Sequence, residues 1–148
     1  MKLAADTNIL FTFFWKHSLL RTILTEKHLQ LISPEYALNE ILCYKEEIKK
    51  KAKLSRDEFN KIFAELQQQV IFVPVLEYQN NMKEAATVIK ISALTEDEKK
   101  EIIDDIDFLA LSLKLNCLLW SNDTLLKKQK KIPVITTKEL IDLLAEFR

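Results

Sequence analysis

Five short apolar runs alternate with longer helical patterns along the chain, and this alternation is the feature that most constrains its fold. The runs span residues 2–5, 29–32, 70–75, 117–120 and 133–135. Runs of this length between helical segments are typical of buried strands. Strands that alternate with helices predict a parallel sheet covered on both faces, with right-handed connections. We therefore expect a single α/β domain over residues 1–148, a three-layer, Rossmann-like α/β/α fold around a central five-stranded parallel sheet.

The segments between these runs carry helix signals. Ser33 and Pro34 look like an N-cap followed by proline at the first helical position. Ser55 and Glu58 have the spacing of a capping box. The expected helices cover residues 9–25 with a break near 16–18, 34–53, 56–69, 77–90, 95–100, 102–115, 125–131 and 137–147.

The chain contains no glycine in 148 residues. An average chain of this length would have about ten. Phosphate sites built on a glycine loop are therefore excluded, including the P-loop, the G-x-G-x-x-G turn and the kinase loop. The G-x-S-x-G nucleophile elbow is excluded as well. Any chemistry must come from side chains.

Net charge and cysteine content bear on the class of nucleic-acid protein and on the cellular location. Lys plus Arg number 22 and Asp plus Glu number 22, so the formal net charge is zero. A non-specific nucleic-acid binder is usually basic, whereas a nuclease needs only a local basic rim. Cys43 and Cys117 offer neither metal-ligand spacing nor a disulfide framework, which favours a reduced, cytoplasmic location. The sequence predicts no membrane span and no secretory leader.

Two acidic residues follow predicted strands. Asp6 ends the first strand, and Asp123 comes shortly after the fourth. Parallel strands end at the same edge of a sheet, and ligands bind outside the carboxyl ends at the point where the strand order reverses. Either Asp alone is explained by an N-cap role, because a helix follows each. Their convergence at one edge is what indicates a site.

A third acid comes from the apolar helix expected at residues 102–115. With Leu109 as the centre of the buried face, Asp105 lies about 40° away, whereas Asp104 and Asp107 lie about 140–160° away, towards solvent or the other side of the helix. A carboxylate on the buried side near a helix start has two explanations. It caps free N–H groups, or it turns into a cleft and binds a cation.

The fourth acid, Glu40, lies about 100° from Ile41, at the border of the buried face of its helix. Four converging carboxylates would repel one another and raise each other's pKa unless a cation were bound. Hard oxygen ligands without His or Cys suit Mg²⁺ or Mn²⁺. Such an ion activates water and stabilises charge on a phosphodiester during cleavage.

These residues lie in motifs that resemble those of PIN-domain nucleases. Asp6-Thr7-Asn8 is similar to the D-x-N opening of that family. The other matching stretches are residues 33–41 (SPEYALNEI), 104–113 (DDIDFLALSL), 119–123 (LWSND) and 136–140 (TTKEL). The motifs run in the family's order, and the family's acids fall on Glu40, Asp105 and Asp123. Asn116 stands where the family often has glycine, and residues 76–100 match nothing in it.

The resemblance implies a PIN-like fold and a Mg²⁺- or Mn²⁺-dependent endoribonuclease. Asp6, Glu40, Asp105 and Asp123 would be the catalytic metal ligands, with Asn8 and Ser121 supporting them by hydrogen bonds. Many small, single-domain members are toxins of toxin–antitoxin pairs and are commonly homodimers. The resemblance therefore implies RNA as substrate, an antitoxin protein as partner and a homodimer.

Two further features bear on substrate and partner. The lysines after Asp123 form either a solvated face or a phosphate-binding rim; they are Lys127, Lys128, Lys130 and Lys131. A second basic run, at residues 49–53, ends the Glu40 helix. The aromatic residues between 11 and 15 form either part of the core or, as the second choice, a dimer interface that includes Phe14 and Trp15.

Three other functions are weighed against a nuclease. A non-catalytic PIN-like module that binds RNA or protein is disfavoured by the presence of all four acids. A receiver domain needs paired acids after the first strand, but Ala4 and Ala5 precede a single Asp6. A haloacid-dehalogenase-like phosphatase needs D-x-D, and Asn8 stands at the third position.

Overall fold

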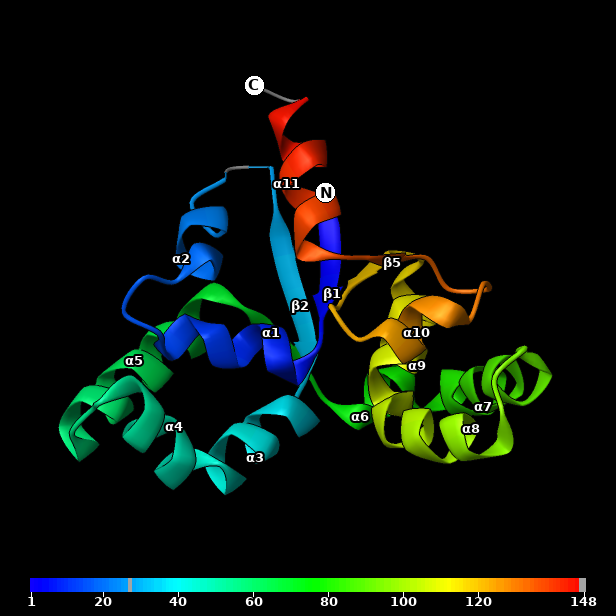
Figure 1. Ribbon diagram of the computed structural model, residues 1–148, viewed down its shortest axis with the longest axis horizontal. Helices are drawn as coiled ribbons and strands as arrows, with labels where there is room; N and C mark the ends of the chain where they lie inside the picture. The colour runs from blue at the N-terminus through cyan, green and yellow to red at the C-terminus, as the bar shows by residue number, and fades with distance from the viewer. Residues whose placement is uncertain (27, 147–148) are drawn as a thin grey trace.

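The computed structural model describes residues 1–26 and 28–146 and is built around one parallel sheet (Figure 1). The strands are β1 (Lys2–Ala5), β2 (Gln30–Pro34), β3 (Ile71–Val73), β4 (Leu118–Trp120) and β5 (Val134–Ile135). Their order is β3-β2-β1-β4-β5, and every pairing is parallel. The α/β fold with a five-stranded parallel sheet flanked by helices is confirmed.

Helices connect the strands and flank the sheet. In Figure 1, α1 and α2 lie to one side of β1 and β2, and α9 lies to the other. The helices are α1 (Thr7–Phe11), α2 (Leu19–Ile23), α3 (Tyr36–Cys43), α4 (Lys45–Ala52), α5 (Arg56–Gln69), α6 (Val75–Tyr78), α7 (Met82–Ile91), α8 (Glu96–Ile102), α9 (Ile106–Leu115), α10 (Thr124–Lys128) and α11 (Thr137–Ala145). Three 3-10 turns are η1 (Thr12–Phe14), η2 (Gln79–Asn81) and η3 (Ile103–Asp105).

The strand order reverses between β1 and β4, which are neighbours in the sheet. Ala5 is in register with Trp120, so both strands end at the same level. The N–H of Asp6 donates to the carbonyl of Trp120 at 3.2 Å, which ties the residue after β1 to the last residue of β4. This is the kind of edge at which α/β sheets bind ligands.

The expected helix start at Ser33 and Pro34 is wrong, because both residues belong to β2. Ser33 is in register with Phe72 of β3. Its hydroxyl donates to the carbonyl of Ala5 at 2.9 Å, so it bridges two strands instead of capping a helix. The helix begins at Tyr36, after a residue that makes no side-chain cap. Strand pairing on both sides of β2 overrides the local signal.

Long helical patterns are divided where the backbone bends. The helix expected at 34–53 is split into α3 and α4 at Tyr44, which has φ −98° and ψ 13°. The one expected at 102–115 begins with the turn η3. Asn116 takes the left-handed conformation, with φ 50° and ψ 51°, which Asn tolerates after a helix. The capping box of Ser55 is confirmed. The last helix is described to Ala145, and its expected end at 147 lies outside the described residues.

Residues 76–100, which have no counterpart in the motifs, cover the helix that carries Asp105. They form most of α6, all of α7 and the start of α8, and α6 and α7 pack against α9. Because α9 also packs against β1, β2 and β4, this segment holds it between two layers. Its structural role is thus to fix α9 against the sheet.

The aromatic residues after Asp6 divide between core and surface. Phe13 and Phe14 are buried, and Phe14 stacks on Phe59 with ring centroids 5.0 Å apart. Phe14 therefore cannot contribute to a dimer interface, because it is already packed inside the protein. Phe11 and Trp15 are only half-buried. No helix in the described ranges has the length and apolar character needed to cross a bilayer.

Candidate active site

Asp6 lies at the junction of β1 and α1 and is almost fully buried. One carboxylate oxygen, Oδ1, accepts from the N–H of Ile9 at 2.9 Å and caps α1. The other, Oδ2, accepts from the hydroxyl of Ser121. Burial raises the pKa of Asp6, and the charges of Asp123 and Glu40 raise it further. Asp6 is therefore a helix cap and also part of an acidic group.

Asp123 reaches the same edge from β4, with Ser121 between the two acids. The buried Ser121 hydroxyl donates to Asp6 and accepts from the N–H of Asp123 at 3.0 Å. Asp123 is half-buried and caps α10 by accepting from the N–H of Leu125 at 2.8 Å. One serine thus fixes the spacing of the residues that follow β1 and β4.

Asp105 occupies the N-cap position of α9, but its side chain makes no capping hydrogen bond. Of the two explanations for this acid, the cap is therefore not the one the structure shows. Burial raises the pKa of Asp105 to about 7, and the next largest causes are the charges of Asp123, Asp6 and Glu40. Asp105 is thus electrostatically coupled to each of the other three predicted ligands.

Glu40 lies on α3 and is half-buried. Its Oε1 accepts from the hydroxyl of Thr7 at 2.6 Å, so the residue after Asp6 fixes the fourth acid. Burial raises the pKa of Glu40, and the charges of Asp107 and Asp104 raise it further. Glu40, the one acid of α3, therefore faces the acids that precede and begin α9.

Of the two orientations open to Asp107, the structure shows the side of α9 that faces α6 and not solvent. Asp107 is half-buried, and its Oδ2 accepts from the hydroxyl of Tyr78, which is only 1% exposed. The helical wheel assumed one continuous α-helix from residue 102. Asp107 and Leu109 both lie within α9, so their angular separation stands, but α6 and α7 pack against α9 as a second layer and bury part of the side away from the sheet. The partner Tyr78 lies in the segment that the motifs did not cover. Asp104 is exposed, as expected.

Tyr36 is a neighbour of the acids that sequence reasoning missed. It is the first residue of α3 and is 40% exposed. Burial raises the pKa of its hydroxyl, and so do the charges of Glu40, Asp107, Asp104 and Asp105. Its ring contacts Phe108 edge-on at 6.4 Å between centroids. The motif at residues 33–41 contains Tyr36, but its pattern singled out only the acid.

Asn8 is exposed and lines two hollows at this edge. One, of about 230 Å³, also contains Asp6 and Asp123. The other, of about 350 Å³, also contains Glu40. Within the described part of the chain, Asn8 donates no hydrogen bond to the four acids. Its supporting role stays a prediction.

Two of the lysines after Asp123 form ion pairs away from the four acids. Lys127 forms an ion pair with Glu139 and donates to the carbonyl of Val134, and Lys128 pairs with Glu98 at 2.7 Å. Lys128, Lys130 and Lys131 line a hollow beside the end of α7 and not either hollow that holds the acids. Their contact with phosphate stays a prediction, and it would have to be made at a distance from the acids.

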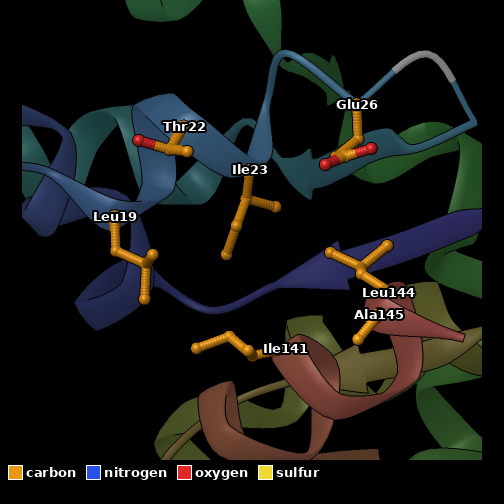
Figure 2. A pocket seen from close by; sticks show the side chains of 7 residues that line it. All are labelled: Leu19, Thr22, Ile23, Glu26, Ile141, Leu144 and Ala145. Atoms are coloured by element: carbon orange, nitrogen blue, oxygen red, sulfur yellow. The ribbon is translucent and has the colours of Figure 1, made fainter. Parts of the chain in front are cut away.

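A further hollow, of about 230 Å³, lies away from the acids, between α2 and α11. Figure 2 shows Leu19 and Ile23 of α2 facing Ile141 and Leu144 of α11 across it. Its lining is mainly apolar and lacks the predicted ligands, so the hollow offers nothing for phosphodiester chemistry.

The acids at the β1–β4 edge fit a hard divalent cation by their donor chemistry. Their oxygens are the preferred ligands of Mg²⁺ and Mn²⁺. Among residues 1–26 and 28–146, no three His, Cys, Asp or Glu side chains are arranged to hold a metal ion as they stand. The acids nevertheless raise one another's pKa, and a cation would relieve that repulsion.

The family of the chain follows from this fold and from a direct match. Residues 5–140 match the PIN domain family, which covers nearly the whole chain. The protein therefore belongs to the PIN domain family, whose members are generally nucleases. The comparison with curated proteins found no significant match.

Proposed function

We propose that this protein is a metal-dependent ribonuclease that hydrolyses phosphodiester bonds in RNA. One observation supports it above the others. Asp105 has a half-buried carboxylate that caps nothing, yet it is coupled to Asp6, Asp123 and Glu40 at the reversal point of the sheet. A carboxylate held there without a structural partner is typical of a ligand or a catalytic group.

In this proposal Asp6, Glu40, Asp105 and Asp123 hold Mg²⁺ or Mn²⁺. A bound ion of this kind activates water and stabilises the charge that develops on the phosphate. Ser121 keeps Asp6 oriented by donating to Oδ2, which leaves the carboxylate fixed at both oxygens. Thr7 does the same for Oε1 of Glu40.

The direct test is cleavage of labelled RNA with EDTA, with Mg²⁺ and with Mn²⁺. We expect cleavage only with metal, and loss of roughly 10²–10³-fold or more for Asp105→Asn. Asp142→Asn is the matched control, because Asp142 is an exposed acid on α11. Cleavage that persists with EDTA would exclude the proposal. RNA binding without cleavage under any metal would instead favour the non-catalytic module.

Metal binding is testable without activity. A ligand that binds only the folded state at about 100 times its dissociation constant adds about 2.7 kcal/mol to the free energy of unfolding. Mn²⁺ or Mg²⁺ should therefore raise the melting temperature, and Asp6→Asn should abolish most of that gain. A melting temperature indifferent to both metals at high millimolar concentration would show that the acids are not a metal site.

We also propose that the chain acts as the toxin of a toxin–antitoxin pair and forms a homodimer. The family motifs support the first part. Exposed Leu19 and Ile141, which flank the hollow between α2 and α11, support the second (Figure 2). Growth arrest on expression, relieved by the product of a small neighbouring reading frame, tests the toxin role. Light scattering tests the dimer, and a monomeric mass at micromolar concentration would contradict it.

A further inference from the structure

The hollow beside Glu40 continues the candidate active site along α1, α3 and α4. Figure 1 shows α1 above these two helices, and Glu40 belongs both to the acids and to the wall of the hollow. The hollow has a volume of about 350 Å³ and is lined by Asn8, Phe11, Trp15, Glu40, Tyr44, Glu47, Ile48 and Lys51. Whatever fills it would lie next to a substrate atom held at the acids.

Three aromatic rings line this hollow, and of these only Phe11 packs against the hydrophobic core. Tyr44 is 49% exposed, and Phe11 and Trp15 are half-buried. Tyr44 is the bend between α3 and α4, and its ring meets Phe11 edge-on at 5.8 Å between centroids. The bend thus brings an exposed ring from α3 against α1. Exposed aromatic surface of this kind favours a flat, apolar-faced ligand.

The charges around the hollow indicate how such a ligand would be oriented. Glu40 and Glu47 would repel a phosphate inside it, so its occupant should be uncharged. Lys51 stands in the lining on the last turn of α4, beside Lys49 and Lys50. Lys51 is paired with Glu47 at 3.1 Å, but both side chains are more than half exposed, so this pair is weak. A negative group just beyond the occupant would therefore meet a lysine.

We propose that this hollow binds one unpaired nucleobase of a single-stranded RNA, adjacent to the phosphate that the acids attack. This inference rests on the proposed function and specifies its substrate. A base stacks on Trp15 or Tyr44, the Asn8 amide offers a donor and an acceptor to its edge, and the next phosphate contacts Lys51. A base in a duplex cannot enter, because its faces are already stacked.

Trp15 provides a readout that does not depend on cleavage. The chain has two tryptophans, and the other, Trp120, is 2% exposed. We expect a short single-stranded RNA to change Trp15 fluorescence saturably in the wild-type chain with EDTA and in Asp105→Asn with Mg²⁺. The same RNA in a duplex should change it much less. Trp15→Phe should lose the signal while still binding the RNA in a filter assay.

Tyr44 tests the stacking itself. Tyr44→Leu keeps an apolar side chain but removes the aromatic face, and it should weaken RNA binding and raise KM by about 5- to 100-fold. Tyr44→Phe should restore most of both. Leu42→Ala is the matched control, because Leu42 is equally exposed on α3 but lies outside the lining.

The outcomes of these experiments distinguish a base-binding site from a contact with a second copy of the chain. Metal-dependent cleavage with unchanged Trp15 fluorescence, and with unaltered KM in Tyr44→Leu, would overturn the base-binding site and leave the nuclease intact. Binding to single strands that Tyr44→Leu weakens, without cleavage, would support the site and remove the nuclease. Fluorescence that follows protein concentration but not RNA would overturn the site and assign the hollow to a second copy of the chain.

Discussion

Two buried hydroxyl groups donate to carboxylates at opposite sides of the same acidic edge. Ser121, which follows β4, donates to Asp6, and Tyr78 of α6 donates to Asp107. Both donors are fully or almost fully buried. The two pairs look alike chemically, but they differ in what surrounds each acid. Asp6 is coupled to Asp123 and Glu40, whereas Asp107, whose charge also acts on Glu40, is held by a donor from the packing of α6 against α9.

A hydrogen bond from a buried hydroxyl therefore does not by itself distinguish a proposed metal ligand from an acid held by packing. The Ser121 pair joins the ends of the two strands at which the sheet order reverses. The Tyr78 pair joins a helix to the segment that covers it. Asp105 is grouped with the Ser121 pair, because among the neighbouring charges those of Asp123 and Asp6 raise its pKa most. We therefore expect the strand-end pair to control chemistry and the helix pair to control packing.

The sharpest way to break this comparison is to neutralise the acids of η3 and α9 one at a time. Asp105→Asn should lower the cleavage rate by roughly 10²–10³-fold or more, because metal positioning and charge stabilisation fail together. Asp107→Asn and Asp104→Asn should leave rates within a few-fold. Steady-state cleavage of one RNA by the three variants measures this. A dead Asp107→Asn enzyme beside an active Asp105→Asn one would reverse the assignment of the two groups.

Ser121→Ala should have the next largest effect. It replaces no proposed ligand, but it removes the donor to Asp6 Oδ2 and the acceptor for the N–H of Asp123. Groups that orient ligands are typically worth about 10- to 100-fold in metal affinity or activity. The apparent metal affinity, from cleavage rate against Mn²⁺ concentration, is the quantity to measure. Ser112→Ala is a matched control, because Ser112 is a buried serine that donates to the carbonyl of Phe108. Equal effects of the two variants on metal affinity would contradict a role for Ser121 at the site.

The pH dependence of the free energy of unfolding tests whether the pKa of Asp105 is raised. Its pKa is raised from the ordinary 3.8 to about 7, so the folded protein binds a proton that the unfolded chain has released. The free energy of unfolding of the metal-free protein should therefore fall as pH rises from about 4 to 7 and level off above. Denaturant unfolding in EDTA should show Asp105→Asn about 2 kcal/mol more stable than wild type at pH 8 and similar at pH 4. A constant difference between the two proteins across this range would contradict the raised pKa.

The sequence predicts those features of the fold that depend on residues close together in the chain, and it fails where residues distant in sequence decide the structure. Strand positions and the sheet class follow from apolar runs, and Asp6 and Asp123 follow from the rule that parallel strands end together. The start of α3 does not follow, because Ser33 is held in β2 by neighbouring strands that are distant in sequence.

The acids of α9 show the same limit within one motif. The wheel distinguishes Asp105 from its neighbours but assumes a uniform helix, and η3 breaks that assumption. The partner of Asp107 could not be predicted, since Tyr78 meets it only through packing of a segment with no recognisable motif. The hollow beside Glu40 likewise depends on the bend at Tyr44, which the local sequence did not predict.

The smallest expected effect on cleavage comes from Tyr78→Phe, which completes the comparison with Ser121→Ala. The substitution removes the hydroxyl that donates to Asp107 and keeps the ring that fills the core. Loss of a hydrogen bond to a charged group should lower the free energy of unfolding by about 1–3 kcal/mol, because Asp107 is half-buried and loses its donor. Cleavage rates at saturating metal should stay within a few-fold, since the strand-end acids keep their own donors. A loss of metal affinity as large as that of Ser121→Ala, in a protein that still unfolds cooperatively, would place Asp107 among the ligands.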